Sequence, residues 1–132
     1  MSIQSQVRST VIGWGLEPAQ RERLLKAFRP AYPDVVADHV TLAVGVADEA
    51  SLPEEICGEI VGRVDDRCGL EVMVVSIGGT TQRPGGGIYH ITWSLDRARG
   101  RTPVQSNQVL AQWSWVRLPW PIPITLEPTR WP

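Results

Sequence analysis

The run from Leu70 to Ile77, Leu-Glu-Val-Met-Val-Val-Ser-Ile, restricts the fold more than any other part of this sequence, because it is mostly apolar and rich in β-branched residues. A strand of this composition is typical of the middle of a sheet. Residues 60–64 are similar in character, and the polar segment 65–69 between the two runs predicts a hairpin turn. The chain is therefore expected to be organised around a sheet.

Glycine and proline set the limits of the elements near the N-terminus. Pro18 predicts the first turn of a helix that ends before Pro30, and Arg21 and its charged neighbours are expected to face water from this helix. Gly13 lies within the preceding strand, where it is expected either to weaken the strand or to mark a close approach of backbones.

Proline also interrupts the C-terminal region, where Pro119, Pro121 and Pro123 favour an edge strand or a bulged one. The tryptophans of this region are expected to pack in the core and at its rim. The expected strands are 9–16, 35–45, 60–64, 70–77, 89–95, 113–118 and 122–126, and the expected helices begin at Pro18, near Pro53 and at Pro103, the last of them reaching Gln112.

This order of elements places a strand and a helix around each of two similar strands, 35–45 and 89–95. We therefore expect one domain, residues 1–132, of the α+β class, in which two pseudo-symmetric lobes of antiparallel sheet with flanking helices enclose a central groove. The hydrophobic content of 42% and the charged content of 20% are those of a globular protein.

The net charge of −1 argues against a protein that grips long DNA through many phosphates, whereas a small anion or a single nucleic-acid end fits it. Cys57 and Cys68 form neither a CxxC pair nor a disulfide scaffold. The chain shows no apolar leader and no run of about 18 apolar residues. A cytoplasmic protein without a membrane partner is expected.

Both histidines of the chain lie in the same local pattern. His39–Leu42 is His-Val-Thr-Leu, and His90–Trp93 is His-Ile-Thr-Trp. Because the side chains of a strand alternate between its faces, each histidine shares a face with the threonine two residues later, while apolar residues occupy the other face. The repeat indicates one chemical device used twice.

Two His-x-Thr strands in tandem resemble the two-histidine phosphoesterase superfamily, including its RNA ligase-associated and cyclic phosphodiesterase-like members. The matching residues are His39 with Thr41 and His90 with Thr92. The resemblance implies a hydrolase of RNA processing that opens a 2′,3′-cyclic phosphate or a related cyclic or 2′-5′ phosphodiester without a metal or another cofactor. Its partner would be a small nucleotide or an RNA terminus, and a cyclic dinucleotide or oligonucleotide signal is the alternative substrate.

The residue types fit this chemistry. Opening a phosphodiester requires one proton to be taken from water and one to be given to the leaving oxygen, and histidine can do either near neutral pH. Thr41 and Thr92 would donate hydroxyl hydrogen bonds to the non-bridging oxygens. The sequence leaves open which histidine is the base and which is the acid.

Three further side chains are candidates for substrate binding. Arg83 and Thr81 lie in the glycine-rich loop before His90, where a guanidinium group could meet a phosphate in bidentate fashion or simply face solvent. Ser94 shares the face of His90 and could line the groove, whereas Tyr89 is expected to point away and pack.

Two other functions compete with phosphodiester hydrolysis. One is a module that binds a nucleotide or RNA end without turnover. The other is a metal site, which is disfavoured because the chain has no H-x-H and no H-E-x-x-H motif, and because Asp38 is expected to point to the face opposite His39. No metal-ligating set is therefore predicted, and the sequence does not indicate an oligomeric state.

Overall fold

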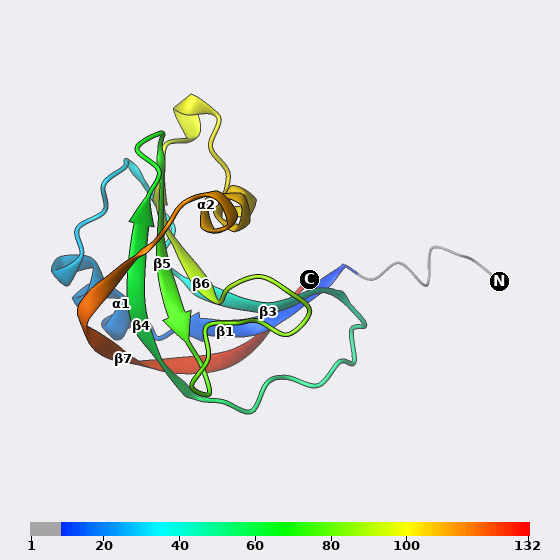
Figure 1. Ribbon diagram of the computed structural model, residues 1–132. Coiled ribbons are helices and arrows are strands. Elements are labelled where there is room, and N and C mark those ends of the chain that lie inside the picture. Colours follow the sequence, from blue (N-terminus) through cyan, green and yellow to red (C-terminus); the bar gives the residue numbers. More distant parts are fainter. Residues whose placement is uncertain (1–8) are drawn as a thin grey trace.

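A seven-stranded antiparallel sheet, in the order β2-β6-β5-β4-β7-β1-β3, forms the body of the protein (Figure 1). The computed structural model describes residues 9–132. The strands are β1 (Thr10–Leu16), β2 (Asp34–Val35), β3 (His39–Val46), β4 (Cys57–Asp65), β5 (Leu70–Ser76), β6 (His90–Leu95) and β7 (Val116–Trp131), and the α-helices are α1 (Pro18–Ala27) and α2 (Ser106–Gln112).

The sheet curls until its two end strands, β2 and β3, are joined by only three residues. β2 pairs with β6, and β3 pairs with β1 at the opposite end of the strand order. Between them, the amide of Ala37 donates to the carbonyl of Thr92 in β6 at 2.8 Å, whereas the carbonyl of Asp38 accepts from the amide of Leu16 in β1 at 2.9 Å. The expected strand 35–45 is thus divided at Ala37, which has a φ of 44°.

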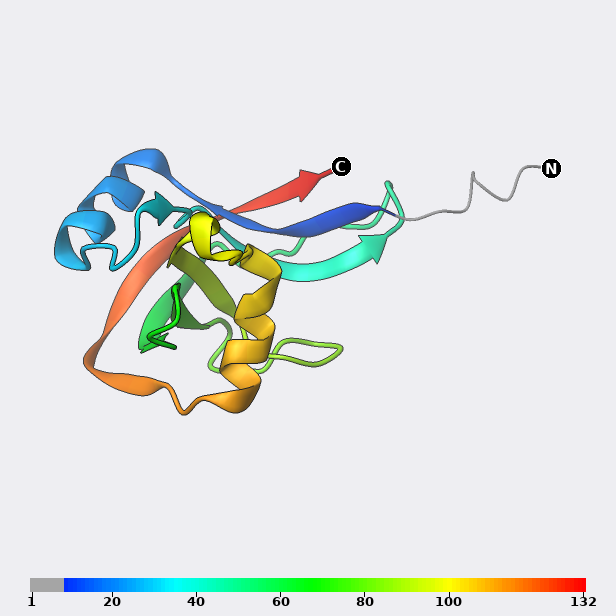
Figure 2. The same ribbon diagram turned by 90° about the horizontal axis from the view of Figure 1, so that it is seen from above.

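Each face of the curled sheet carries an apolar core, and Figures 1 and 2 show α1 and α2 on different sides of it. Along β5, Met73 and Val75 belong to the first core and Val72 and Val74 to the second, so this strand is buried on both faces as expected. The first core also holds Trp14, Val40, Ile60, Ile91, Trp93, Ile124 and Leu126, and the second holds Val61, Val64, Leu70, Leu95, Val109 and Leu110.

Helix α1 begins at Pro18, as expected, because the carboxylate of Glu17 accepts hydrogen bonds from the first free amides of the helix. The expectation that Arg21 faces water is wrong. Its Nε donates to the carbonyl of Ala37 at 2.8 Å, and its terminal nitrogen donates to the carbonyl of Val36 at 3.0 Å. Arg21 therefore fixes the link between β2 and β3.

The short helix expected near Pro53 is absent, since residues 51–56 are irregular and β4 begins directly afterwards at Cys57. The carbonyls that a helix would use are bonded elsewhere. Glu55 accepts from the indole nitrogen of Trp14 and Ile56 accepts from the amide of Leu126, both at 2.8 Å. Tertiary contacts have replaced local helical bonds in this segment.

The two C-terminal strands expected at 113–118 and 122–126 are one strand, β7, that pairs with β4 at its start and with β1 at its end. The register on β4 shifts from Ile60 opposite Ile122 to Gly62 opposite Arg117, so residues 118–121 bulge out. Pro119 and Pro121 lie in this bulge, where the sheet needs no amide donor from them. The expectation of a bulged strand is confirmed. The expectation that the prolines divide this region into two strands is wrong.

The remaining elements agree with the sequence. The turn 65–69 joins β4 to β5, with the carboxylate of Asp66 accepting from the amides of Cys68 and Leu70. Residues 103–112 form a 3-10 turn followed by α2.

The α+β class is confirmed, with one continuous curled sheet. In residues 9–132 no helix has the length and apolarity that crossing a membrane requires.

Candidate active site

The two His-x-Thr strands meet where the sheet closes on itself. In the ladder between β2 and β6, Asp34 lies opposite Leu95 and Val35 opposite Ser94, and the hydrogen bond from Ala37 to Thr92 keeps the same register. Beyond Ala37 the chain enters β3, which is in contact with β6, and the charge of His39 acts on His90. The two imidazoles therefore lie near each other.

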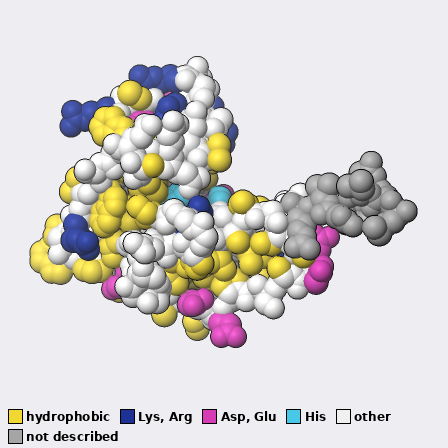
Figure 3. Space-filling model, turned by 45° about the vertical axis from the view of Figure 1, so that its right-hand side comes forward, with side chains coloured by type: hydrophobic (Ala, Val, Ile, Leu, Met, Phe, Trp, Pro, Cys, Tyr) yellow, Lys and Arg dark blue, Asp and Glu magenta, His cyan; other side chains and the backbone are white. Residues whose placement is uncertain are grey.

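The surface view agrees with this proximity. Cyan side chains can only be His39 and His90, since the chain has no other histidine, and they emerge together in a hollow beside a dark blue basic group (Figure 3). Further along the same strands, Leu42, Ala43 and Val44 of β3 face Arg83–Gly86 across a cavity of 230 Å³. β3 and the loop before β6 therefore run side by side beyond the histidines.

His90, the first residue of β6, is half-buried and has a defined tautomer. Its Nδ1 lies 2.7 Å from the carbonyl oxygen of Ile88, which can only accept, so Nδ1 carries the proton and Nε2 carries the lone pair of the neutral ring. Burial lowers the pKa of His90 below its ordinary value, and the nearby positive charges of Arg83 and His39 lower it further. A neutral His90 is a proton acceptor at neutral pH.

His39, the first residue of β3, is held differently. An oxygen of the Asp38 carboxylate lies against its Nδ1, and the ring of Trp131 packs beside it with centroids 5.4 Å apart. The expectation that Asp38 points away is wrong, because the chain turns at Ala37 and regular alternation begins only at His39. This exposed pair adds little stability, but it leaves Nε2 of His39 available for a ligand.

The two threonines of the pattern occupy unlike surroundings. Thr41 is partly exposed on β3. Thr92 is only 6% exposed, and its hydroxyl lies 2.7 Å from the hydroxyl of Ser106 at the start of α2 and 3.4 Å from the carbonyl of Pro103. The Thr92 hydroxyl therefore ties β6 to α2 in this structure, whereas Thr41 remains partly accessible.

The loop before His90 carries the positive charge of the site. The Nε of Arg83 donates to the carbonyl of Gly86 at 3.1 Å, and its terminal nitrogen lies 3.4 Å from the amide oxygen of Asn107. These contacts hold the guanidinium group close enough to lower the pKa of His90. Thr81 lies farther back in the loop, where it is partly exposed and its carbonyl accepts from the amide of Tyr89.

Ser94 does not reach the histidines. It is fully buried, its hydroxyl donates to the carboxylate of Glu71 at 2.7 Å, and the amide of Tyr32 donates to it at 3.2 Å. Its hydrogen-bonding capacity is used within the protein, so the expectation that it lines a groove is wrong. Tyr89 packs in the first core against Trp14, as expected.

Sequence reasoning missed three contributors to the site. Asp38 is adjacent to His39 and was visible as a candidate partner, whereas Trp131 and Asn107 gave no local signal because both reach the site through distant parts of the chain. In residues 9–132 no group of three His, Cys, Asp or Glu side chains is placed to bind a metal ion.

Comparison of the chain with protein-family models, curated proteins and solved structures finds no match.

Proposed function

We propose that the protein is a metal-independent phosphodiesterase that opens 2′,3′-cyclic phosphates at RNA ends or in small nucleotides. The observation that supports this proposal is the proximity of His39 and Arg83 to His90, whose pKa both of their charges lower. Two imidazoles and a guanidinium group are sufficient for the two proton transfers and for binding an anion.

His90 is the proposed general base. Its Nδ1 is bonded to a carbonyl, its lowered pKa favours the neutral ring, and its free Nε2 takes a proton from the attacking water. The water oxygen bonds to phosphorus as the bond to the 2′ or 3′ ribose oxygen breaks. His39 in its protonated form donates the proton of Nε2 to that leaving oxygen, so a phosphomonoester and a hydroxyl result.

Arg83 and Thr41 are the proposed contacts of the non-bridging oxygens. The guanidinium group of Arg83 would offset the charge that develops on them, and the Thr41 hydroxyl would donate a hydrogen bond. Thr92 is assigned a positioning role, since its hydroxyl is bonded to Ser106. We further propose that the substrate lies in a groove between two halves of the curled sheet, β3-β1 on one side and β6-β5-β4 on the other.

One observation favours a second function, the binding of a nucleotide end without turnover. Thr92 is buried against Ser106, so one of the two hydroxyl donors expected for the transition state is not directed at the histidines. Such a module would retain Arg83 and the imidazoles as anion ligands.

The deciding experiment is incubation with 2′,3′-cyclic, 2′-5′ linked and 3′-5′ cyclic nucleotides and a cyclic dinucleotide, with products identified by mass. We expect hydrolysis of the 2′,3′-cyclic nucleotides that is unchanged by EDTA. His39→Ala and His90→Ala should each lower kcat by about 10²- to 10⁴-fold while binding is largely retained. Tight binding without any product would favour the non-catalytic module, and loss of turnover with EDTA that zinc restores would contradict the proposal.

A further inference from the structure

A cavity with a basic and aromatic lining lies away from the histidines. It has a volume of 510 Å³ and lies beside the hairpin of β4 and β5 and the end of α2, where Arg63, Val64, Asp65, Arg67, Trp113, Ser114 and Val116 line it. Leu95 pairs with Leu70 at this end of the sheet, five residues from His90, or about 17 Å along the strand. The cavity is thus separate from the proposed active site.

A second cavity adjoins the first. It has a volume of 220 Å³, and Asp66, Cys68, Arg101, Gln108, Val109, Gln112 and Trp113 line it. Trp113 is the residue that the two cavities share, and 44% of it is exposed. An indole that borders two cavities offers its surface to planar ligands, and stacking on such a ring does not depend on the identity of a base.

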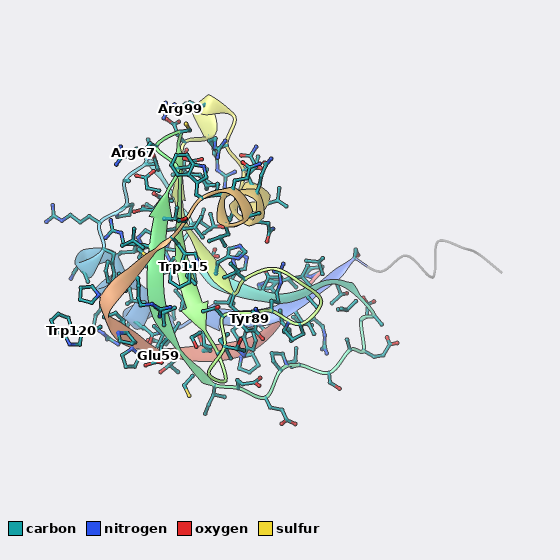
Figure 4. All side chains as sticks on the ribbon, viewed as in Figure 1. Glu59, Arg67, Tyr89, Arg99, Trp115 and Trp120 are labelled. Atoms are coloured by element: carbon teal, nitrogen blue, oxygen red, sulfur yellow. The ribbon has the colours of Figure 1, made fainter. Side chains whose placement is uncertain are left out.

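Arginines line both cavities beside this tryptophan, Arg63 and Arg67 in the larger and Arg101 in the smaller. Arg67 and Arg99 project together at this end of the molecule, where dark blue side chains gather on the surface (Figures 3 and 4). A Cβ added to Gly69 of the hairpin would lie 3.0 Å from Arg101 and 3.6 Å from Arg99, so these arginines pack against the turn. The guanidinium groups can reach phosphates next to a stacked base.

The two acidic residues that line these cavities are bonded within the protein. The carboxylate of Asp65 accepts from the hydroxyl of Tyr32 and the amide of Arg67, and Asp66 is paired with Arg101. Arg63 and Arg67, which line the larger cavity, are exposed. The two linings together hold three arginines, Arg63, Arg67 and Arg101, against two carboxylates, Asp65 and Asp66, so the local charge is positive although the whole chain has a net charge of −1.

We propose that the cavities beside Trp113 form a second binding site, which takes a nucleotide with its base against the indole and its phosphate on Arg67 and Arg63. A cavity of 510 Å³ lies within the usual range of ligand pockets, about 300–1,000 Å³. The amides of Gln108 and Gln112 in the smaller cavity supply donors and acceptors for a second base or a ribose. The nucleotide is either free or part of a single-stranded RNA.

The test is a titration of the full-length protein with 5′-AMP and, separately, with a fluorescein-labelled single-stranded hexaadenylate that has hydroxyl ends. Hydroxyl ends exclude the terminal phosphate that the proposed active site would bind. Trp113→Ala should weaken binding at least 10-fold and Trp113→Phe less than about 3-fold, because phenylalanine keeps an aromatic face. Trp120→Ala is the matched control, since Trp120 is 76% exposed and lines neither cavity.

Further measurements make the result decisive. Arg67→Gln should weaken binding and lessen its dependence on salt, because a phosphate contact is lost. If Trp113→Ala fails to fold, the indole N–H resonance of Trp113 in the wild-type protein should shift with ligand. If the binding of AMP depends on Trp113, the ligand of the site is a free nucleotide. If only the binding of the hexamer depends on Trp113, the ligand is a single-stranded RNA.

Equal binding by Trp113→Ala and Trp120→Ala, or an unchanged Trp113 resonance at saturation, would overturn the proposal. His90→Ala should bind the hexamer as the wild type does, because the hexamer has no terminal phosphate for the proposed active site. Failure of hydrolysis and failure of this second site are therefore distinguishable.

Discussion

The hydroxyl oxygen of Thr92 lies 2.7 Å from the hydroxyl oxygen of Ser106, and the two residues are 6% and 0% exposed. This hydrogen bond joins the strand that begins with His90 to the first turn of α2. A buried hydroxyl that loses its partner is costly, whereas removal of both hydroxyls is nearly neutral. The pair therefore couples the packing of α2 to the strand that carries His90.

Thr92→Val and Ser106→Ala are each expected to lower the free energy of unfolding by about 1–3 kcal/mol, because each leaves the other hydroxyl without this partner. The double variant should lose less than the sum of the two single losses. Urea denaturation of the four proteins measures this difference, and Thr92→Ser, which keeps the hydroxyl, is the control. Strictly additive losses would show that the two hydroxyls do not interact.

Arg83→Gln is expected to raise the pKa of His90, because the positive charge of Arg83 is one of the causes that lower it. NMR titration of the His90 ring protons measures the change directly. If His90 is the general base, the acidic limb of the hydrolysis profile should move to higher pH by the same amount. Arg97→Gln, at an exposed position that is not among the causes of the shift, is the control, and an equal change in both variants would contradict the assignment.

Stability should fall on acidification because of His90. Its pKa in the folded protein is lower than the ordinary value of 6.5, so just below pH 6.5 the unfolded chain binds more protons than the folded one. The contribution of neutral His90 is fully present above pH 6.5 and is lost as the pH falls through the folded pKa. Urea unfolding at pH 7, 6 and 5 should show a smaller loss for His90→Gln than for the wild type, and parallel losses would contradict the lowered pKa.

The sequence predicted the parts of the fold that local patterns determine. The apolar run of β5, the hairpin before it and the proline that begins α1 depend on neighbours in the chain. The helix expected near Pro53 failed because the carbonyls of Glu55 and Ile56 bond to Trp14 and Leu126, which local propensity cannot reveal. Distant partners decide the structure in such segments.

In the candidate site, too, some features follow from local sequence patterns and others depend on distant residues. The shared face of each histidine and its threonine is an expectation from the period of a strand, and the structure brings His39 near His90. The burial of Thr92 and Ser94 could not be predicted, because Ser106 and Glu71 reach them from other elements. The expected direction of the Asp38 side chain was wrong because β3 begins only at His39, so Asp38 lies outside the strand and does not follow its alternation.

Gly13 is expected to control the position of His39. A Cβ at Gly13 would lie 2.1 Å from the carbonyl oxygen of Val40, which is backbone and cannot turn aside, whereas a Cβ at Gly15 would meet only the Thr129 hydroxyl at 3.6 Å. Gly13→Ala should therefore lower the free energy of unfolding by about 3 kcal/mol or more, and Gly15→Ala should change it by less than about 1 kcal/mol.

The same substitution tests the link between this contact and function. Because Val40 follows His39 directly, separating β3 from β1 at Gly13 would also displace His39 from His90. Under conditions in which the variant is folded, Gly13→Ala should lower kcat for a 2′,3′-cyclic nucleotide more than Gly15→Ala does. Denaturation curves and turnover measured on the two matched variants decide this, and equal effects would show that the approach of β3 to β1 does not set the spacing of the imidazoles.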